Sequence, residues 1–566
     1  MIAIIGLDGA TLDLAGPYME AGDMPVLRAL IASGAGGVLH STTPPVTFPA
    51  WSSFMTGVNP GKHGIFDFTR RISGSYELAF VSSRDRRLPT IWRLLSDAGR
   101  RVAVLGVPTT YPPEAVNGIM VGGFDSPVAT GIDGSFVHPP GFYAEMTRAV
   151  GSYSVTDFQE LRIGPNWHAD ALPKILAGIE RKRALARYVL RREPWDCFMV
   201  LFGEADTAAH HFWMFTDPGS PRFAAEGAAR FGGALRDVYR RLDDALAAIL
   251  DEVPAQSTVL VASDHGFGGA GTTVLHLNRW LADEGWLTFR RGPGGITPRL
   301  ARGARRLALT ALPRMVQERL VRRTGRGLAR RLESWSRFAA IDMAHTRAFS
   351  EELNYAPSIW LNVRGRDPAG TVAPGREYDA VAAAIRERLL AWRHPTTGAA
   401  VVEAVYRRDA LYHGPAVAEA PDLVVELALE NDYSYACLPT VPGERLSVRR
   451  LAPSEHVAGK GGGMNGSHRS QGLWALAGPD VRPGTAADAA IVDVAPTVLH
   501  LTGLPVPAWM DGRLLPGVDG RPSVSHDYPV GPVSPYCAAE REGGGTGEEE
   551  VWRRLASLGY LGDYGR

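Results

Sequence analysis

The feature that most constrains this chain is a set of short, continuous apolar runs separated by longer stretches with helical periodicity. The runs are rich in Val, Ile and Leu and lack period-two alternation, which is typical of strands buried on both faces. We expect strands at Ile2–Leu7, Val102–Leu105, Cys197–Phe202, Thr258–Ala262, Leu423–Leu427 and Leu473–Leu476. Helical patterns occur at Leu172–Arg191 and Ala224–Leu250. Strands alternating with helices predict an α/β fold, in which a central, mostly parallel sheet carries helices on both faces.

The composition excludes several other classes of protein. The chain has 566 residues, of which 45% are hydrophobic and 21% charged, and this excludes collagen, a coiled coil and wholesale disorder. Lys+Arg and Asp+Glu both number 60, so the formal net charge is zero and no specific nucleic-acid partner is expected. The three cysteines are far apart, which excludes a disulfide framework and fits a reducing compartment.

The chain also lacks the sequence signs of secretion or membrane insertion. No apolar stretch reaches the ~18 residues expected of a membrane span. The apolar run Ile2–Leu7 has no basic region before it and is too short for a signal peptide. We therefore expect a cytoplasmic protein.

One segment differs from the rest in composition. Arg290–Arg337 contains fourteen arginines and only two acids, Glu318 and Glu333, among apolar residues. This pattern predicts short basic amphipathic helices. They would form either a solvated cap or a surface that binds anionic lipid or a phosphorylated substrate. We expect a catalytic core in two parts, 1–285 and 341–535 (the second with room for a subdomain), an Arg-rich helical insertion or cap at 286–340, and a flexible linker with a C-terminal helix at 536–566.

Polar residues stand where the expected strands end. Asp8, Asp206 and the pair Asp264–His265 follow buried apolar runs directly or within a few residues. In open α/β sheets, ligands gather at the carboxyl ends of the strands. These residues are therefore candidates for a functional site, although each could instead form a turn or cap a helix.

The residue types favour a metal site. Asp supplies a hard oxygen and His a borderline nitrogen, a mixture that suits zinc or manganese. If a helix begins near Asp206, the four-residue spacing places Asp206 and His210 on one face, where they can hold one ion. The neighbouring His211 would point elsewhere and pack.

Two further residues complete the candidate set. His468 stands in a glycine-rich string, where the backbone must bend sharply or approach something closely, although a surface-loop histidine is the alternative. Thr47 lies before Ala50–Thr56, which can begin a helix just after Pro49. A hydroxyl near a helix N-terminus can act as a nucleophile when a metal ion lowers its pKa. Position alone does not distinguish it from the neighbouring hydroxyls Ser41, Thr42, Thr43, Ser52, Ser53 and Thr56.

The motifs together resemble a known family. The strings GLDGAT, VTFPAWSSFMTGVNPGKHGI, EADTAAH, SDHG and GSHRSQGLWALAGP occur in this order. In this the chain resembles the alkaline phosphatase superfamily, and in particular its type I phosphodiesterase/nucleotide pyrophosphatase branch. Ile491–Leu515 resembles that superfamily's near-terminal segment. The resemblance covers about residues 1–285 and 340–515.

The resemblance implies a mechanism. Asp8, Thr47, Asp264 and His265 match the ligands of one metal site, with Thr47 as the nucleophile. Asp206, His210 and His468 match the ligands of a second site. The cofactors implied are two divalent metal ions, zinc in the first instance, with manganese as the alternative. Thr47 would form a phosphothreonine ester, which water would then hydrolyse in a phosphodiesterase or pyrophosphatase reaction.

The sequence departs from the family pattern at one place. Many members of the branch carry an Asn shortly after the HGI triplet, where it binds a phosphate oxygen, but this chain has Phe68 there. We expect Asn59, Lys62 or His63 to replace that donor. The expected substrate is a small nucleotide-, sugar- or lipid-linked phosphate. No Cys-x-Pro-Ser-Arg string surrounds Thr47, so a formylglycine sulfatase is not indicated.

Three other functions remain open at this point. The chain could be a phosphomonoesterase or phosphonate hydrolase of the same superfamily. It could be a metal-dependent transferase, because an alcohol can capture a phosphothreonine instead of water. It could also be a non-catalytic membrane-associated protein on this fold, with peripheral membrane contact through residues 290–337.

Overall fold

The computed structural model describes residues 1–123, 134–151, 166–290, 338–352, 357–441, 443–457 and 463–528. Nearly all of the Arg-rich insertion and the C-terminal linker and helix lie outside these residues, so their expected roles stay predictions. No described helix is long and apolar enough to cross a bilayer.

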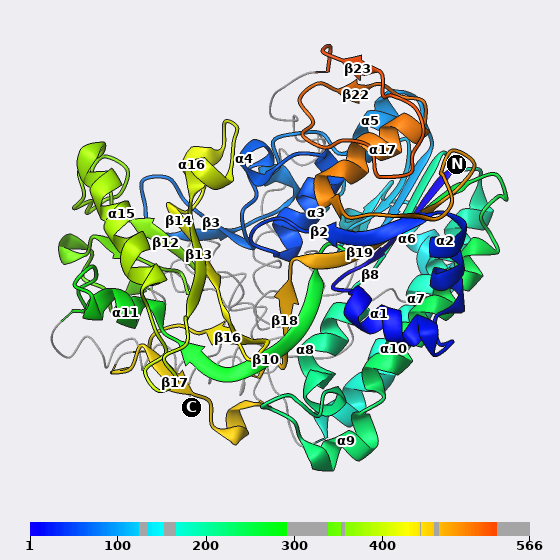
Figure 1. Ribbon diagram of the computed structural model, residues 1–566. Coiled ribbons are helices and arrows are strands. Elements are labelled where there is room, and N and C mark those ends of the chain that lie inside the picture. Colours follow the sequence, from blue (N-terminus) through cyan, green and yellow to red (C-terminus); the bar gives the residue numbers. More distant parts are fainter. Residues whose placement is uncertain are drawn as a thin grey trace.

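A large sheet forms the centre of the described chain (Figure 1). Nine of its strands follow the order β20-β2-β19-β9-β1-β8-β5-β6-β7, and β21 pairs with β2. Their bounds are β1 Ile2–Leu7, β2 Ala35–His40, β5 Val102–Leu105, β6 Gly118–Val121, β7 Val137–His138, β8 Cys197–Phe202, β9 Thr258–Ala262, β19 Gln471–Ala477, β20 Thr485–Ala486 and β21 Ala489–Ala490. The expected strands β1, β5, β8 and β9 have the predicted bounds.

The sheet is mostly parallel, as predicted. β1 pairs in parallel with β8 on one side and with β9 on the other. The exception near the centre is β19, which lies antiparallel between β9 and β2. The carboxyl ends of β1, β8 and β9 therefore meet at one edge.

Helices cover both faces of this sheet, and alternate residues of β1 point into two separate cores. Ala3 and Ile5 belong to one core, whereas Ile2 and Ile4 belong to the other. The helices of the first core are α1 Leu12–Glu20, α2 Pro25–Ser33, α6 Phe142–Val150, α7 Trp167–Arg192, α8 Glu204–Thr216 and α10 Ala234–Leu250. Those of the second are α3 Thr47–Thr56, α5 Ile91–Asp97 and α17 Val494–Leu501.

The helical stretch expected at Ala224–Leu250 is divided in two. The structure has α9 at Ala225–Phe231 and α10 at Ala234–Leu250, with Gly232 and Gly233 between them. Glycine is about 1 kcal/mol less favourable than alanine in a helix interior, so two in succession favour a break.

Two smaller sheets lie beside the central one (Figure 1). The first joins β10 Gly266–Leu275, β15 Leu429–Glu430, β16 Tyr433–Cys437, β17 Val448–Arg450 and β18 Gly466–Arg469. The second joins β11 Ala348–Phe349, β12 Ser358–Leu361, β13 Val402–Arg407 and β14 Leu423–Leu427. Shorter or peripheral helices are α4 Pro60–His63, α11 Leu277–Asp283, α15 Arg376–Leu390 and α16 Arg408–Leu411. The predicted strand Leu423–Leu427 thus forms, but outside the central sheet.

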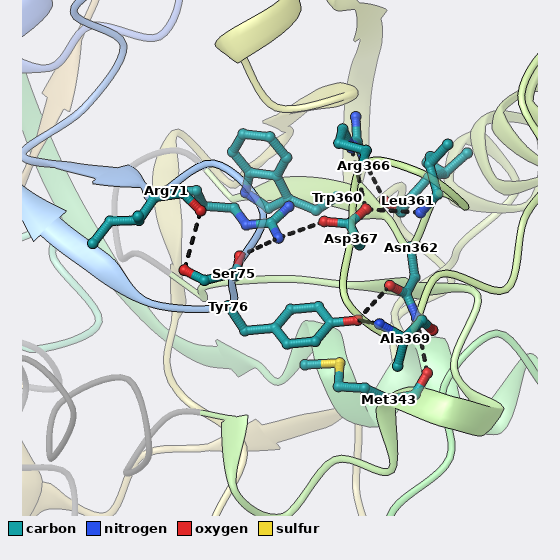
Figure 2. A network of polar contacts seen from close by, with 12 residues as sticks. Arg71, Ser75, Tyr76, Met343, Trp360, Leu361, Asn362, Arg366, Asp367 and Ala369 are labelled. Atoms are coloured by element: carbon teal, nitrogen blue, oxygen red, sulfur yellow. Dashed lines mark hydrogen bonds and ion pairs between the residues drawn. The ribbon is translucent and has the colours of Figure 1, made fainter.

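A hairpin of β3 (Thr69–Arg71) and β4 (Leu78–Phe80) is fastened to the second small sheet (Figure 2). The Arg71 guanidinium donates to Asp367 at 2.6 Å and lies 4.7 Å from the centre of the Trp360 ring. The Tyr76 hydroxyl donates to Asn362 at 2.7 Å. The hairpin follows α4, so this clamp links the segment after the HGI triplet to the small sheet.

Candidate active site

Four of the candidate residues lie at the carboxyl edge of the central sheet. Asp8 follows β1, Asp206 lies in the first turn of α8 just after β8, and Asp264 and His265 form the turn between β9 and β10. The helix expected near Asp206 is therefore present as α8, and it places His210 one turn beyond Asp206. All of these residues are buried.

Thr47 reaches the same edge on α3. This helix begins at Thr47 and not after Pro49, so the expected start was three residues too late. Proline is tolerated in the first turn of a helix because N–H groups there have no intrahelical acceptor. Thr47 thus stands at the N-terminus, with its Oγ1 3.3 Å from Nε2 of His265.

His468 comes from the far end of the chain. It is not a surface-loop histidine: it lies in β18, which pairs antiparallel with β10 and places His468 opposite Phe267. A side chain at Gly466 would bring a Cβ to 2.5 Å from the carbonyl oxygen of Ala209. Glycine at this position is needed for the strand to pass close to α8.

Three of these side chains form a compact group. Oδ1 of Asp206 lies 3.2 Å from Nε2 of His210 and 3.3 Å from Nε2 of His468. The two imidazole nitrogens are themselves 3.2 Å apart. The three atoms make a nearly equilateral triangle.

A second group forms around His265. Its Nε2 lies 3.6 Å from Oδ1 of Asp8, 3.5 Å from Oδ2 of Asp264 and 3.3 Å from the Thr47 hydroxyl. The His265 ring stacks on that of His468, with 3.8 Å between the ring centres. The two groups are therefore adjacent.

The hydrogen bonds of the imidazoles fix which nitrogen faces the carboxylates. Nδ1–H of His210 donates to the carbonyl of Gly466 at 3.0 Å, and that of His265 to Gly266 at 3.1 Å. Nδ1–H of His468 donates to the carbonyl of Pro45 at 2.9 Å. In the neutral ring, Nε2 then carries the lone pair, and in all three residues Nε2 points into the groups.

In Asp8 and Asp264, likewise, one carboxylate oxygen accepts a hydrogen bond from a described residue and the other does not. Oδ2 of Asp8 accepts from the Trp51 indole at 3.2 Å, and Oδ1 of Asp264 accepts from the amide of Gly9 at 3.2 Å. Among the described residues, no hydrogen-bond donor satisfies the buried Oδ1 of Asp8, Oδ1 of Asp206 or Oδ2 of Asp264. Buried acceptors without a donor are costly, so their convergence indicates a place for cations.

Burial and crowding also shift the pKa values of these groups. Burial, together with the charge of Asp206, raises the pKa of Asp8 to about 8. Burial and the charge of Asp8 raise the pKa of Asp264 well above its usual range. Burial lowers the pKa of His265, which keeps its ring neutral. Positive charge is thus what the cluster lacks.

The geometry fits divalent metal ions. Four ligands at about 2.0–2.1 Å from a tetrahedral zinc ion lie about 3.3 Å from one another. The three distances of the first group and the three from Nε2 of His265 in the second run from 3.2 to 3.6 Å. The donor set of carboxylate oxygens and imidazole nitrogens also suits zinc or manganese.

Asn59, Lys62 and His63 are not brought to this cluster. The Asn59 amide and the Lys62 ammonium both donate to Asp511, and Lys62 also donates to the carbonyl of Trp509. His63 is buried, and its Nε2 lies 3.0 Å from the hydroxyl of Ser53. These contacts lie toward or beyond the C-terminal end of α3, whereas the cluster lies at its N-terminus.

Phe68 has a packing role. It is buried, and its ring lies 4.5 Å from that of Phe48, the residue after Thr47. The side chain that stands where many relatives have an Asn therefore fills the core beside the start of α3.

Sequence reasoning missed three residues that hold the cluster in place. Trp51 follows Thr47 by one helical turn, and this spacing could have indicated that both lie on the face of α3 turned toward the cluster. Glu204 pairs with the buried Lys182 at 2.9 Å, two residues before Asp206. Neither the long separation along the chain nor the ordinary composition around Lys182 signals that contact.

Comparison with known proteins decides the family. The sequence model of the family described as type I phosphodiesterase / nucleotide pyrophosphatase matches residues 2–437. The chain belongs to this family. Members of this family hydrolyse phosphoesters, and so this chain is a phosphoester hydrolase of the phosphodiesterase/nucleotide pyrophosphatase type. The predicted membership of the alkaline phosphatase superfamily is confirmed.

The solved structure of one bacterial hydrolase shows the same fold. Phosphonoacetate hydrolase from Sinorhizobium meliloti 1021, in complex with phosphonoformate, matches with a TM-score of 0.51 and 15% identity over 88% of this chain and 95% of that chain. Human ectonucleotide pyrophosphatase/phosphodiesterase 5 matches with a TM-score of 0.46 and 12% identity over 91% and 97% of the two chains. No curated protein sequence matches the chain.

Proposed function

We propose that this chain is a two-metal phosphodiesterase or nucleotide pyrophosphatase in which Thr47 is the nucleophile. The observation that carries the proposal is the convergence of six potential metal ligands: three imidazoles turn Nε2, and three carboxylates turn an oxygen that has no hydrogen-bond donor among the described residues, into two adjacent groups. Family membership supplies the reaction class.

The two groups would hold one ion each. Asp206, His210 and His468 would hold the first, and Asp8, Asp264, His265 and Thr47 the second. When bound, two divalent ions neutralise the charge of the phosphoryl group and lower the pKa of the hydroxyl and water oxygens beside them. We propose zinc, with manganese as the alternative, because the donor set suits both.

The place of Thr47 at the start of α3, beside His265, supports the following reaction. Its Oγ attacks phosphorus in line, a phosphothreonine ester forms, and the first leaving group departs with the electron pair of its bond to phosphorus. Water then attacks the same phosphorus from the opposite side and Thr47 leaves, so two inversions give net retention. The N-terminus of α3, where Thr47 stands, would stabilise the negative charge of a phosphoryl group bound there.

We propose a small phosphodiester or pyrophosphate as substrate, such as a nucleotide-, sugar- or lipid-linked phosphate. The family description supports this class. Phe68 supplies no hydrogen-bond donor, so recognition of the phosphoryl group falls to the metal site and the start of α3 rather than to that position.

The test compares metal content and turnover in wild type and Thr47→Ala. We expect wild type to contain about two transition-metal ions and to hydrolyse bis(p-nitrophenyl) phosphate. Thr47→Ala should retain metal and lose turnover by about 10³-fold or more. Thr56→Ala is the matched control, because this hydroxyl of the same helix donates to the carbonyl of Ser52 and lies away from the cluster.

Each other outcome has a defined meaning. If wild type contains metal and Thr47→Ala turns over as fast as wild type, another group is the nucleophile. Faster turnover of p-nitrophenyl phosphate than of the diester would favour the phosphomonoesterase alternative. A wild-type chain that binds no metal and turns over neither ester would leave the non-catalytic alternative.

A further inference from the structure

Phe267 lies at the centre of the imidazole cluster. It is the second residue of β10, directly after the turn that carries Asp264 and His265, and its side chain is 1% exposed. Its ring centre lies 4.7 Å from that of His210, 5.2 Å from that of His468 and 5.9 Å from that of His265. One phenyl ring therefore contacts an imidazole of each ligand group.

These contacts restrain the tilt of the imidazole rings, which the hydrogen bonds leave free. A single Nδ1–H bond to a carbonyl fixes one atom of an imidazole, but the ring can still tilt about that atom. The edge-to-face contacts, with interplanar angles of 74° to His210 and 62° to His468, fix the tilt. The directions of the Nε2 lone pairs of His210 and His468 then depend on Phe267, and His265 is restrained through its stacking on His468.

The surrounding backbone is fitted to the phenyl ring. A Cβ at Gly9 would lie 2.9 Å from Cε2 of Phe267, and a Cβ at Gly466 would lie 2.9 Å from Cδ1. Gly9 adjoins Asp8, and Gly466 accepts the hydrogen bond of His210. Two glycines thus allow the backbone of both ligand groups to approach the same ring.

The ring is also held from behind. Trp213 stacks on Phe267 with 6.5 Å between ring centres and an angle of 24°. Trp213 follows His210 by three residues on α8 and so lies on the same helix face. Phe267 is confined between this indole and the imidazoles and has little room to shift.

We propose that Phe267 is a positioning residue that sets the relative placement of the two ligand groups, and so governs the metal affinity of both. The proposal rests on the proposed function, since it requires that the groups bind metal. Substitutions of residues that orient metal ligands typically weaken metal affinity by about 10–100-fold. Loss of the phenyl ring should do so for both ions together, because the ring contacts both groups.

The experiment is zinc titration of chelator-stripped protein by calorimetry, for wild type, Phe267→Leu and Phe198→Leu. Phe198 is an equally buried phenylalanine of the same core, but it lies at the amino end of β8, about 13 Å of strand from the carboxyl edge. We expect Phe267→Leu to raise both zinc Kd values by about 10–100-fold. Phe198→Leu should lower the Tm of the metal-free protein similarly and leave both Kd values unchanged.

The visible spectrum of the cobalt-substituted protein gives a second readout, since it reports ligand geometry directly. A changed spectrum in Phe267→Leu, with the wild-type spectrum in Phe198→Leu, would support the positioning role. Phe267→Met, of similar volume and greater flexibility, serves if the leucine variant does not fold. Wild-type Kd values and spectrum in whichever variant folds would overturn the inference alone, whereas absence of metal binding in wild type would overturn the proposed function as well.

Discussion

At the scale of single residues, the cluster is organised by hydrogen bonds that fix one atom of a ligand and turn another toward the neighbouring ligands. The Nδ1–H groups of the three histidines donate to backbone carbonyls, those of Gly466, Gly266 and Pro45. The Trp51 indole donates to one oxygen of Asp8. The sequence could predict which residues gather, because strand ends and the Asp206–His210 spacing are local signals. It could not predict which atoms face the cluster, because the hydrogen-bond partners come from distant segments.

The indole of Trp51 gives a first prediction. Trp51→Phe removes the donor to Oδ2 of Asp8 and leaves a buried carboxylate oxygen without it, which should cost about 1–3 kcal/mol of unfolding free energy. Trp92→Phe is the control, because Trp92 is equally buried and its indole nitrogen has no hydrogen-bond partner among the described residues. Urea denaturation of both variants measures the difference, and equal losses would contradict a role for the hydrogen bond.

A second prediction concerns His63. Burial, with a further contribution from Arg86, lowers the pKa of His63 to about 3, and Nδ1 accepts from the amide of Ile65. The folded state therefore resists protonation, whereas the unfolded state takes up a proton below pH ~6.5. The contribution of neutral His63 to the unfolding free energy is fully present above that pH. It falls as the pH drops, by about 2 kcal/mol at pH 5.

His63→Gln should remove this part of the acid dependence. The measurement is urea denaturation at pH 7.5 and pH 5, with His40→Gln as control, since His40 is an exposed histidine of β2. The loss between the two pH values should be smaller in His63→Gln by about 2 kcal/mol, and turnover should persist, because His63 does not reach the cluster. An unchanged pH dependence would refute the assignment, and abolished turnover would revive the expected contact of His63 with substrate.

At the scale of elements, the buried parallel strands were predictable and the element boundaries set by tertiary contacts were not. β1, β5, β8 and β9 are continuous apolar runs, a signal contained within each run. The start of α3 and the strand β18 depend instead on neighbours: His265 faces Thr47, and β10 pairs with the glycine-rich segment around His468. A run of glycines indicates close approach but not what is approached.

The hairpin clamp gives a prediction at this scale. Arg71 and Asp367 form an ion pair in which the side chains are 9% and 1% exposed. Arg71→Met leaves Oδ1 of Asp367 without its charged donor while Oδ2 keeps Arg366, so it should lower the unfolding free energy by about 1–3 kcal/mol. Arg70→Met is the control, because the Arg70 side chain is 46% exposed and forms a surface ion pair with Asp85. This substitution should lower the unfolding free energy by about 1 kcal/mol or less.

A double-mutant cycle with Asp367→Asn isolates the clamp. The coupling between the two sites should reach about 1–3 kcal/mol, because one charged hydrogen bond joins them. Independent effects of the two substitutions would show that the aromatic rings around Arg71, and not Asp367, hold the hairpin.

At the scale of the whole molecule, the cluster draws on both ends of the chain. The match to the family ends at residue 437, yet His468 lies on β18 and the next strand, β19, occupies the place between β2 and β9 in the central sheet. The sequence indicated a strand at Leu473–Leu476. It could not indicate its neighbours, because β2 and β9 lie hundreds of residues earlier and pairing across such distances leaves no local pattern.

A chain that ends at residue 450 should therefore not fold, although it contains the whole family match. Leu473, Trp474 and Leu476 are fully buried, and their loss removes about 6 kcal/mol of apolar burial. This is comparable with the total stability of about 5–15 kcal/mol of a typical domain, and it also opens the edges of β2 and β9. Near-UV circular dichroism and urea denaturation should show no native packing. Full-length His468→Ala separates the strand from the ligand: it keeps β19, so it should unfold cooperatively while binding less metal. A truncated chain with native near-UV bands would mean that the first 450 residues form the stable unit and that β19 is an addition to it.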